Sequence, residues 1–401
     1  MNHRGGRAGF VRVRDGRVCV IPDYSGNRMM QSLGNVEATP LASLTFFDFV
    51  SGDILYITGN AKNVVGPDVQ AIMPLANIVT TVEITGFVFV MNSLAVRQKP
   101  ESTVDRSPYS PPVRFLAEEK ESSEISLEDV NVSLKRIKVH TPSIATFTFT
   151  SSKPISIKPG QHAIIDLTAF AGKEPYRHMA HEGFEASLND DCTRTWTVSS
   201  SHSSITQTFE LTIKENKYGA ITGRLFSLAR ALSERAPELM DNSTPLGITV
   251  GLIGIGGVFT LPTKTSKLLM VAGGIGVTPF LSMLNAIITG DASEIWDVIL
   301  IISTREPHLT AELVRLALGT NPSPNIHLII HIFTSVFWTP VDLPVTMHAG
   351  RLDVSFFQTL EDVQDRTVFV CGPPAFEETS IQGLRSAGAS EGSISRENFT
   401  Y

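Results

Sequence analysis

The chain has 401 residues, of which 42% are hydrophobic, and a formal net charge of −7 at pH 7. This length predicts two or three domains with buried cores. The negative charge and the lack of a basic run disfavour nucleic acid as the main partner. Cys19, Cys192 and Cys371 lie far apart without metal-ligand spacing, so we expect no metal site and a reducing, cytoplasmic setting. The N-terminus lacks an apolar signal segment, and glycines and prolines interrupt the uncharged stretches, so we expect no membrane span.

The pattern of apolar residues changes three times along the chain. Residues 1–96 contain apolar or alternating runs separated by Gly and Asp turns, which predict a small β domain. Residues 97–127 combine proline, serine and charge, a composition typical of a linker. Further alternating runs in residues 128–263 predict an antiparallel β-barrel. Residues 264–401 repeat the pattern of apolar strand, glycine turn and helix, which predicts a doubly wound α/β domain with a parallel sheet.

The segment RTWTVSS, which starts at Arg194, is expected to form a strand in the barrel. On a strand, Arg194 and Trp196 share one face and Thr197 takes the other. A guanidinium beside an aromatic ring suits a ligand that has both a phosphate and a flat ring. An ordinary strand with a solvent-reaching arginine is the alternative interpretation, and this segment alone leaves both open.

A glycine-rich turn follows the first apolar strand of the α/β part. Gly273, Gly274 and Gly276 allow a sharp turn and a close backbone approach to a ligand. Thr278 opens the next helix, whose first N–H groups favour a phosphate oxygen. Tight packing between elements is the alternative reason for such glycines.

Other turns have similar features. Cys371 begins the sequence CGPP at the end of a strand, at the sheet edge where doubly wound folds bind ligands. Ser303 and Arg305 follow another strand and could meet a ribose or a 2′-phosphate, although Arg305 could equally be a solvated surface charge. In the barrel part, residues 219–222 (GAIT) lead into a helix and offer N–H groups and the Thr222 hydroxyl to an anion. A simple capped helix start is the alternative there.

Taken together, RTWTVSS, GAIT, GGVFTLP, AGGIGVTP, VCGPP and ENFTY have the order and spacing of the ferredoxin–NADP reductase-like flavoprotein superfamily, which residues 128–401 resemble. The resemblance implies an FAD-binding barrel followed by an NAD(P)-binding domain. It also implies an NAD(P)H-dependent FAD oxidoreductase that takes hydride from the nicotinamide and passes electrons to an acceptor. No further basic residue lies within seven positions after Arg305, which favours NADH over NADPH.

The resemblance assigns roles to individual residues of the barrel. Arg194 would hold the FAD phosphates, and Trp196, which replaces the usual tyrosine, would pack along the flavin. Thr197 would lie near the flavin N5. Ile221 and Thr222 would hold the FAD pyrophosphate.

The resemblance also assigns residues of the α/β part to the nicotinamide dinucleotide and to catalysis. An aromatic side chain near the C-terminus would cover the flavin ring and would move aside before hydride transfer. Candidate catalytic residues are Thr197, Cys371, Glu397 and Phe399. The remaining cofactor-binding candidates are Gly273, Gly274, Gly276, Thr278, Ser303, Arg305, Gly372 and Tyr401.

Residues 1–96 resemble part of the pyridoxamine 5′-phosphate oxidase-like FMN-binding split barrel, through HRGGRAGFVRV, PDYSGNRMMQSLGN and FFDFVSGDILYITGNA. About five strands precede Arg97, fewer than a closed split barrel needs. Arg4, Asn27 and Asn35 could contact a flavin phosphate or hydroxyl. We nevertheless expect one bound FAD, no tightly held FMN, and an exposed edge that favours a homodimer or another protein partner.

Two other functions are compatible with these motifs. One is a tailoring oxidoreductase that reduces a small organic substrate directly in a biosynthetic pathway. The other is a module that binds flavin without redox turnover. Three scattered cysteines cannot supply the four thiolates of an iron–sulfur cluster, so we expect no such cluster within this chain.

Overall fold

A computed structural model describes most of the chain, which forms two compact units. Unit 1 comprises residues 1–122 and 173–191, and unit 2 comprises residues 123–172 and 192–401. The described residues are 2–24, 30–99, 110–111, 113–119, 125–126, 130–172, 188, 190–201, 205–216, 219–263, 265–290, 294–319, 326–338 and 343–397.

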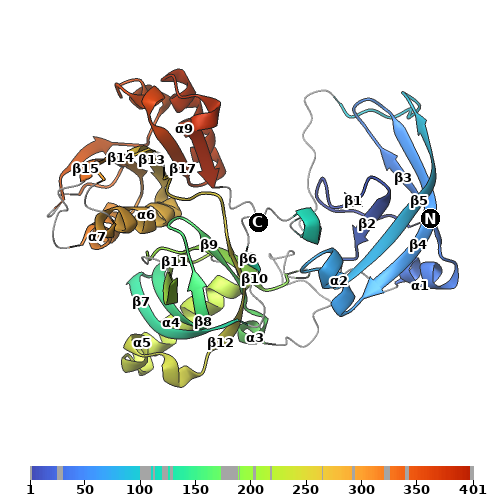
Figure 1. Cartoon of the computed structure of the whole chain (residues 1–401), viewed down its shortest axis with the longest axis horizontal. Coiled ribbons are helices and arrows are strands. Elements are labelled where there is room, and N and C mark those ends of the chain that lie inside the picture. The colour runs from blue at the N-terminus through green and yellow to red at the C-terminus, as the bar shows by residue number, and fades with distance from the viewer. Residues whose placement is uncertain are drawn as a thin grey trace. The chain divides into compact units, whose positions relative to one another are not determined.

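Unit 1 contains an antiparallel sheet of five strands in the order β1-β2-β5-β4-β3 (Figure 1). Alternating apolar residues bury both of its faces, with Val20, Val69 and Val79 on one side and Ile57 and Val82 on the other. The elements are β1 (Arg12–Arg14), β2 (Val18–Pro22), α1 (Gln31–Ala38), β3 (Leu41–Phe47), β4 (Ile54–Val65), α2 (Pro67–Ile72), β5 (Ile78–Val90) and the 3₁₀ turn η1 (Ala117–Glu119).

Part of the predicted linker packs into unit 1. Leu116 is 1% exposed and belongs to the same core cluster as Val20. The Glu119 carboxylate accepts three hydrogen bonds from the Arg12 guanidinium: two from Nε, at 2.9 and 3.2 Å, and one from Nη2 at 2.5 Å. Leu116, the ion pairs Arg12–Glu119 and Arg14–Glu118, and the Arg12 guanidinium over the Phe115 ring therefore attach residues 113–119 to the first sheet.

The first part of unit 2 is a barrel. Its sheet has the order β10-β9-β12-β7-β8-β11, with β6 paired to β12. A bridge between Val198 and Leu211, and a 2.9 Å bond from Ser199 N to Glu210 O, return the last strand to the first. The elements are β6 (Ile125–Ser126), β7 (Asn131–Thr141), β8 (Ile144–Ser156), β9 (His162–Asp166), α3 (Thr168–Ala171), β10 (Thr193–Thr197), β11 (Ile205–Lys214), α4 (Ala220–Arg235), α5 (Glu238–Asp241), η3 (Thr244–Leu246) and β12 (Thr249–Gly256).

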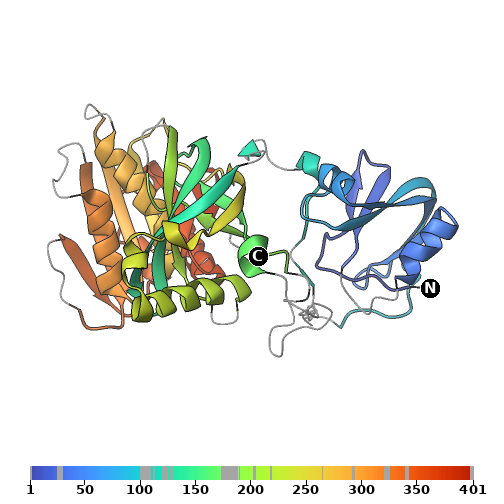
Figure 2. The same cartoon turned by 90° about the horizontal axis from the view of Figure 1, so that it is seen from below.

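Helix α4 packs along the barrel, as Figure 2 shows in yellow-green. Its apolar residues recur every three or four positions, which places them on one face. Phe226 on this face meets Phe147 of β8 edge-on, with ring centroids 6.0 Å apart. The helix and the strands therefore share one core.

The second part of unit 2 is a parallel sheet in the order β16-β15-β14-β13-β17-β18. Helices α6 and α7 cover one face, and α8 and α9 cover the other (Figure 1). The elements are β13 (Lys267–Gly273), η4 (Gly274–Val277), α6 (Thr278–Thr289), β14 (Trp296–Ser303), α7 (Pro307–Leu318), β15 (Ile326–Thr334), β16 (Val345–Ala349), α8 (Val354–Phe357), η5 (Val363–Asp365), β17 (Thr367–Cys371), α9 (Pro374–Ser386), η6 (Glu391–Ser393) and β18 (Ile394–Glu397).

The strand order of this sheet reverses between β13 and β17. The chain runs outward from β13 through β14, β15 and β16, and then returns to place β17 and β18 on the other side. Ligands of open α/β sheets bind outside the carboxyl ends of the strands at such a reversal. The predicted fold class, an antiparallel barrel followed by a doubly wound parallel-sheet domain, is confirmed.

No helix among the described residues combines the length and the apolar character that crossing a membrane requires.

Candidate functional site

Strand β10 carries the three residues that were predicted to contact a flavin. In its antiparallel pairing with β9, Arg194 faces Ile165, Trp196 faces Ala163 and Thr197 faces His162. Trp196 is partly buried and packs against the barrel core. The Arg194 guanidinium donates to the carbonyl of Thr193 at 2.8 Å, so one of its N–H groups is fixed by the strand itself.

The Thr197 hydroxyl is the group on this strand that best tests whether the residues fit a flavin. Thr197 is 5% exposed, and its Oγ1 has no hydrogen-bond partner among the described residues. An unsatisfied buried hydroxyl costs about 1–3 kcal/mol, so native structures rarely keep one without a purpose. A flavin ring nitrogen or carbonyl at this position would satisfy it, which is a fit between the residues present and FAD.

The GAIT turn forms the start of helix α4, with Gly219 as the N-cap. Thr222 does not offer its hydroxyl to an anion in this structure. Its Oγ1 donates to the Asn216 carbonyl at 3.2 Å and accepts from the Asn216 N–H at 3.1 Å. The Ile221 side chain is fully buried in the barrel core. An anion here would therefore contact the first backbone N–H groups of the helix, as helix N-termini allow.

The turns after β13 and β17 touch each other at the reversal of the strand order. A Cβ added to Gly276 would lie 2.3 Å from the carbonyl oxygen of Cys371, so no side chain fits there without a shift. Thr278 is buried, and its hydroxyl donates to the carbonyl of Ile275 at 3.1 Å, which closes the turn before α6. Both predicted turns thus lie at one place, and their contact explains why glycine is required.

Cys371 is fully buried in the core beneath these turns. Burial raises the pKa of its thiol, and the nearby carboxylates of Glu397 and Glu377 raise it further. The thiol therefore stays protonated and neutral near pH 7. Glu377 is itself 4% exposed, and burial raises the pKa of its carboxyl group.

His162 is a residue of this site that the sequence motifs did not indicate. Its Nδ1 lies 3.2 Å from Oε1 of Glu397, and both side chains are mostly buried. His162 pairs with Thr197 across β9 and β10, and Glu397 pairs with Cys371 across β18 and β17. Three predicted catalytic residues are thus neighbours through a histidine that lies 235 positions from Glu397 in the chain. No local pattern could have found such a contact.

The end of β14 holds Ser303 and Arg305 as predicted, and also Glu306. Arg305 is exposed, so its guanidinium can contact either a ligand or water. The Glu306 backbone N–H donates to the Thr304 hydroxyl at 3.0 Å. Its carboxylate Oε2 is buried without a partner among the described residues. This carboxylate was missed because an acidic residue next to an arginine resembles an ordinary surface pair.

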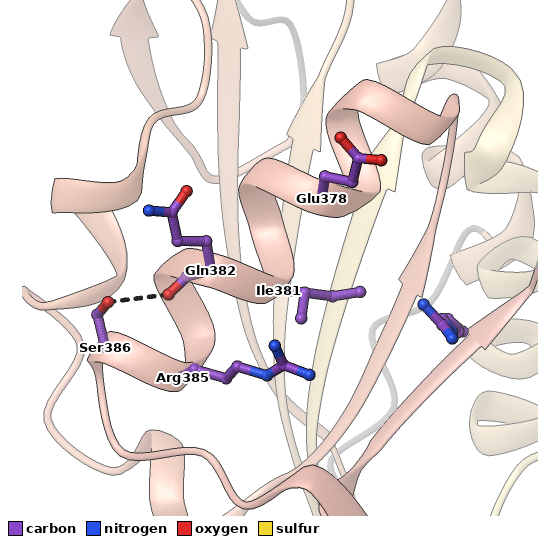
Figure 3. A pocket seen from close by; sticks show the side chains of 6 residues that line it. Glu378, Ile381, Gln382, Arg385 and Ser386 are labelled. Carbon is purple, nitrogen blue, oxygen red and sulfur yellow. Dashed lines mark hydrogen bonds between the residues drawn. The ribbon is translucent and has the colours of Figure 1, made fainter. Parts of the chain in front are cut away.

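Two predicted residues, Phe399 and Tyr401, lie outside the described residues, as does Asn27. Among the described residues, no group of three or more histidines, cysteines and carboxylates could hold a metal ion. A pocket of about 370 Å³ lies elsewhere, between α9 and β18, and contains none of the predicted residues (Figure 3). Its lining consists of Glu378, Ile381, Gln382, Arg385, Ser386 and Arg396.

Comparison with known proteins identifies the α/β part. Residues 270–382 match the family described as oxidoreductase NAD-binding domain. A flavohemoprotein from Rhodopirellula baltica (strain DSM 10527 / NCIMB 13988 / SH1) is 30% identical over 152 residues, 36% of this chain and 35% of that protein. The chain thus spans about a third of the length of this curated relative. The predicted nicotinamide-dinucleotide-binding oxidoreductase domain is confirmed.

Solved structures also resemble the chain. A ferredoxin NADP⁺ reductase from Neisseria gonorrhoeae with bound FAD and NADP has a TM-score of 0.46 and 20% identity, over 69% of this chain and 99% of that chain. The ferredoxin reductase in carbazole 1,9a-dioxygenase has a TM-score of 0.47 and 16% identity, over 67% of this chain and 69% of that chain.

Proposed function

We propose that the chain is an NADH-dependent FAD oxidoreductase that passes electrons to a separate acceptor. One observation carries the proposal. Strand β10, with its buried and unpartnered Thr197 hydroxyl, is connected through His162 and Glu397 to the carboxyl edge of the NAD-binding sheet. A flavin on β10 and a nicotinamide at the β13–β17 reversal would therefore lie next to each other.

The protein's contribution would be binding and alignment. Bound FAD would supply the redox chemistry, because it accepts hydride from a nicotinamide and releases electrons to an acceptor. Arg194 and the N-terminus of α4 would neutralise the phosphates, Trp196 would border the flavin ring, and the Thr197 hydroxyl would hydrogen-bond it. The Cys371 thiol, being neutral, would not act as a nucleophile. It would pack beside the nicotinamide at the two contacting turns.

Arg194 tests the FAD assignment directly. Replacing it with alanine removes a cation from the phosphates, and hydrogen bonds to charged groups are worth about 1.5–3 kcal/mol. We therefore expect Arg194→Ala to weaken FAD binding on the order of tenfold to a hundredfold, measured by flavin fluorescence on titration into apoprotein. Arg136→Ala, at an exposed position of β7, is the control and should bind FAD normally. Full FAD affinity in Arg194→Ala would refute the assignment.

Glu306 supports NADH over NADPH. A carboxylate at the end of β14 can accept a hydrogen bond from the ribose 2′-hydroxyl, whereas it repels a 2′-phosphate. We expect wild type to prefer NADH in kcat/KM, and Glu306→Gln to lose part of that preference. Arg305→Ala should lower kcat/KM for NADPH only, by about 1–3 kcal/mol in transition-state free energy, if its guanidinium meets the 2′-phosphate. Equal losses with both cofactors would exclude that contact.

The same proposal gives unit 1 a role in association rather than in FMN binding. Phe87 and Phe89 pair with Ile57 and Leu55 on the face that packs the core, yet they are 70% and 53% exposed. Apolar residues exposed in a row mark association sites, so we propose a homodimer through unit 1. Light scattering should give twice the monomer mass for the wild type and the monomer mass for Phe87→Asp. The flavin released by heat should be FAD without FMN. FMN released in an amount equal to FAD would show that unit 1 binds FMN, against this proposal.

We also propose a cytoplasmic location. Cys19 and Cys371 are buried free thiols, as expected for a chain kept in a reducing compartment. Cell fractionation of a tagged chain, with the tag's position varied, would test it; recovery in a secreted or oxidising fraction would contradict the proposal.

A further inference from the structure

The barrel and the parallel sheet of unit 2 contact each other through segments around His162. The Gly160 N–H, two residues before it, donates to the Ser282 hydroxyl of α6 at 2.9 Å. Phe259 follows β12 of the barrel and lies in the core of the α/β part, so it also joins the two parts. His162 adds a polar contact between the two parts, because it comes from β9 and reaches Glu397 of β18.

The His162 ring is confined on several sides. Its strand is paired on one side with Thr197 and on the other with Gly256. Gly257 has a φ of +104°, and a Cβ there would lie 3.0 Å from His162 Nδ1. The side chains of His162 and Glu397 are 14% and 11% exposed. A ring packed in this way has little freedom to rotate away from the carboxylate.

The chemistry of the two groups fixes which one donates. An ionised carboxylate only accepts hydrogen bonds, so His162 must carry its proton on Nδ1 to bond Glu397 Oε1 across 3.2 Å. The bond holds the carboxylate in one orientation. It also compensates part of the cost of burying a charge.

We infer that His162 is a positioning residue that orients the Glu397 carboxylate between Thr197 of the barrel and the Cys371 turn of the NAD-binding sheet. This inference rests on the proposed function, since it concerns the place where flavin and nicotinamide would meet. Removing the Nδ1 donor leaves the carboxylate partly buried and free to turn. The two halves of the site then lose a fixed alignment, and hydride transfer depends steeply on alignment.

The protonated ring nitrogen can be observed without any cofactor chemistry. Long-range proton–nitrogen correlation spectra of protein labelled at histidine distinguish the Nδ1–H from the Nε2–H tautomer at a pH where the ring is neutral. We expect Nδ1–H for His162 in the wild type and a changed signal in Glu397→Gln, with Glu378→Gln, on α9, as the control. An Nε2–H tautomer in the wild type would overturn the inference.

Kinetics test the consequence of the contact. An asparagine can place its amide N–H where Nδ1–H lies, so His162→Asn should keep the rate of anaerobic flavin reduction by saturating NADH within about threefold. His162→Leu should lower that rate on the order of tenfold at equal FAD occupancy, and should add little in a Glu397→Gln background. His327→Leu removes an exposed histidine of β15 and should have no effect.

Different results would contradict the positioning role of His162 and the proposed function. Equal rates for His162→Leu and wild type, or a full additional loss in the Glu397→Gln background, would overturn the positioning role. If NADH fails to reduce the flavin of the wild type, the proposed function is wrong, and the tautomer alone decides whether His162 holds Glu397.

Discussion

Gly276 allows close contact between the two turns at the proposed NADH-binding edge. A Cβ added to Gly276 would lie only 2.3 Å from the carbonyl oxygen of Cys371, so a methyl group has no space there. The obstacle is backbone of a buried strand, which cannot turn aside as a flexible side chain can. The residue therefore links local packing to the shape of the ligand-binding edge.

We expect Gly276→Ala to destabilise the protein by about 1–3 kcal/mol, the usual cost of overpacking, and to weaken NADH binding by separating the turns. Urea unfolding and NADH titration measure the two effects. Gly223→Ala is the matched control, because an added Cβ there meets nothing within 4 Å and lies within α4. That change should stabilise by about 0.5–1 kcal/mol. A neutral Gly276→Ala would show that the turns can separate freely.

Sequence motifs indicated residues that lie in local strand–turn–helix patterns, and missed residues whose contacts are distant in the chain. The turn glycines and Cys371 were predicted from strand–turn–helix patterns, and the structure brings them together. The Thr222 hydroxyl contacts the backbone N–H and carbonyl of Asn216 in this structure, so its predicted contact with a pyrophosphate stays a prediction. His162 and Glu306 were missed because their significance depends on packing and on distant partners.

Among the elements, one buried arginine connects the parallel strands at their amino-terminal ends. Arg366 is 5% exposed and precedes β17. Its guanidinium donates to the carboxylates of Asp362, at 2.7 and 2.8 Å, and of Asp297, at 2.9 Å. It also reaches the carbonyl of Leu268 at 3.2 Å. It therefore connects β13, β14 and β17 at the end of the sheet opposite to the proposed site.

Arg366→Met should destabilise the protein by about 2–4 kcal/mol, because it removes the guanidinium that bonds two carboxylates and the Leu268 carbonyl. The value lies below that of a fully buried pair, since both carboxylates are about 30% exposed. FAD content should not change. Arg385→Met is the control: this arginine of α9 is 56% exposed, and its pair with Glu391 should contribute less than about 1 kcal/mol. Equal effects of both substitutions on the urea midpoint would contradict this account.

Long, strongly patterned elements were predictable from the sequence, and short ones were not. Runs such as KLLMVAGG and VTPFLSMLNAII gave β13 and α6 because apolar residues recur at the period of the element. β18 was not predicted, because its four residues, ISRE, have no such pattern. Its pairing with β17 makes it a strand, and that pairing places Glu397 beside Cys371.

For the whole molecule, the order of the parts was predictable from composition and spacing. The change from alternating runs to strand–turn–helix repeats marks the step from the barrel to the parallel sheet. The attachment of residues 113–119 to unit 1 was not predictable, because the buried Leu116 and the ion pairs Arg12–Glu119 and Arg14–Glu118 produce no periodic signal. A linker composition thus does not exclude packing at its end.

We propose above all that the barrel holds FAD where NADH on the parallel sheet can reduce it. Anaerobic titration of the purified protein with NADH, followed by visible absorption, tests this claim most directly. We predict that the protein carries FAD and that about one equivalent of NADH bleaches its flavin absorption, with NADPH less effective in kcat/KM. A protein that binds no FAD, or whose flavin absorption persists under excess NADH and NADPH, would contradict the claim.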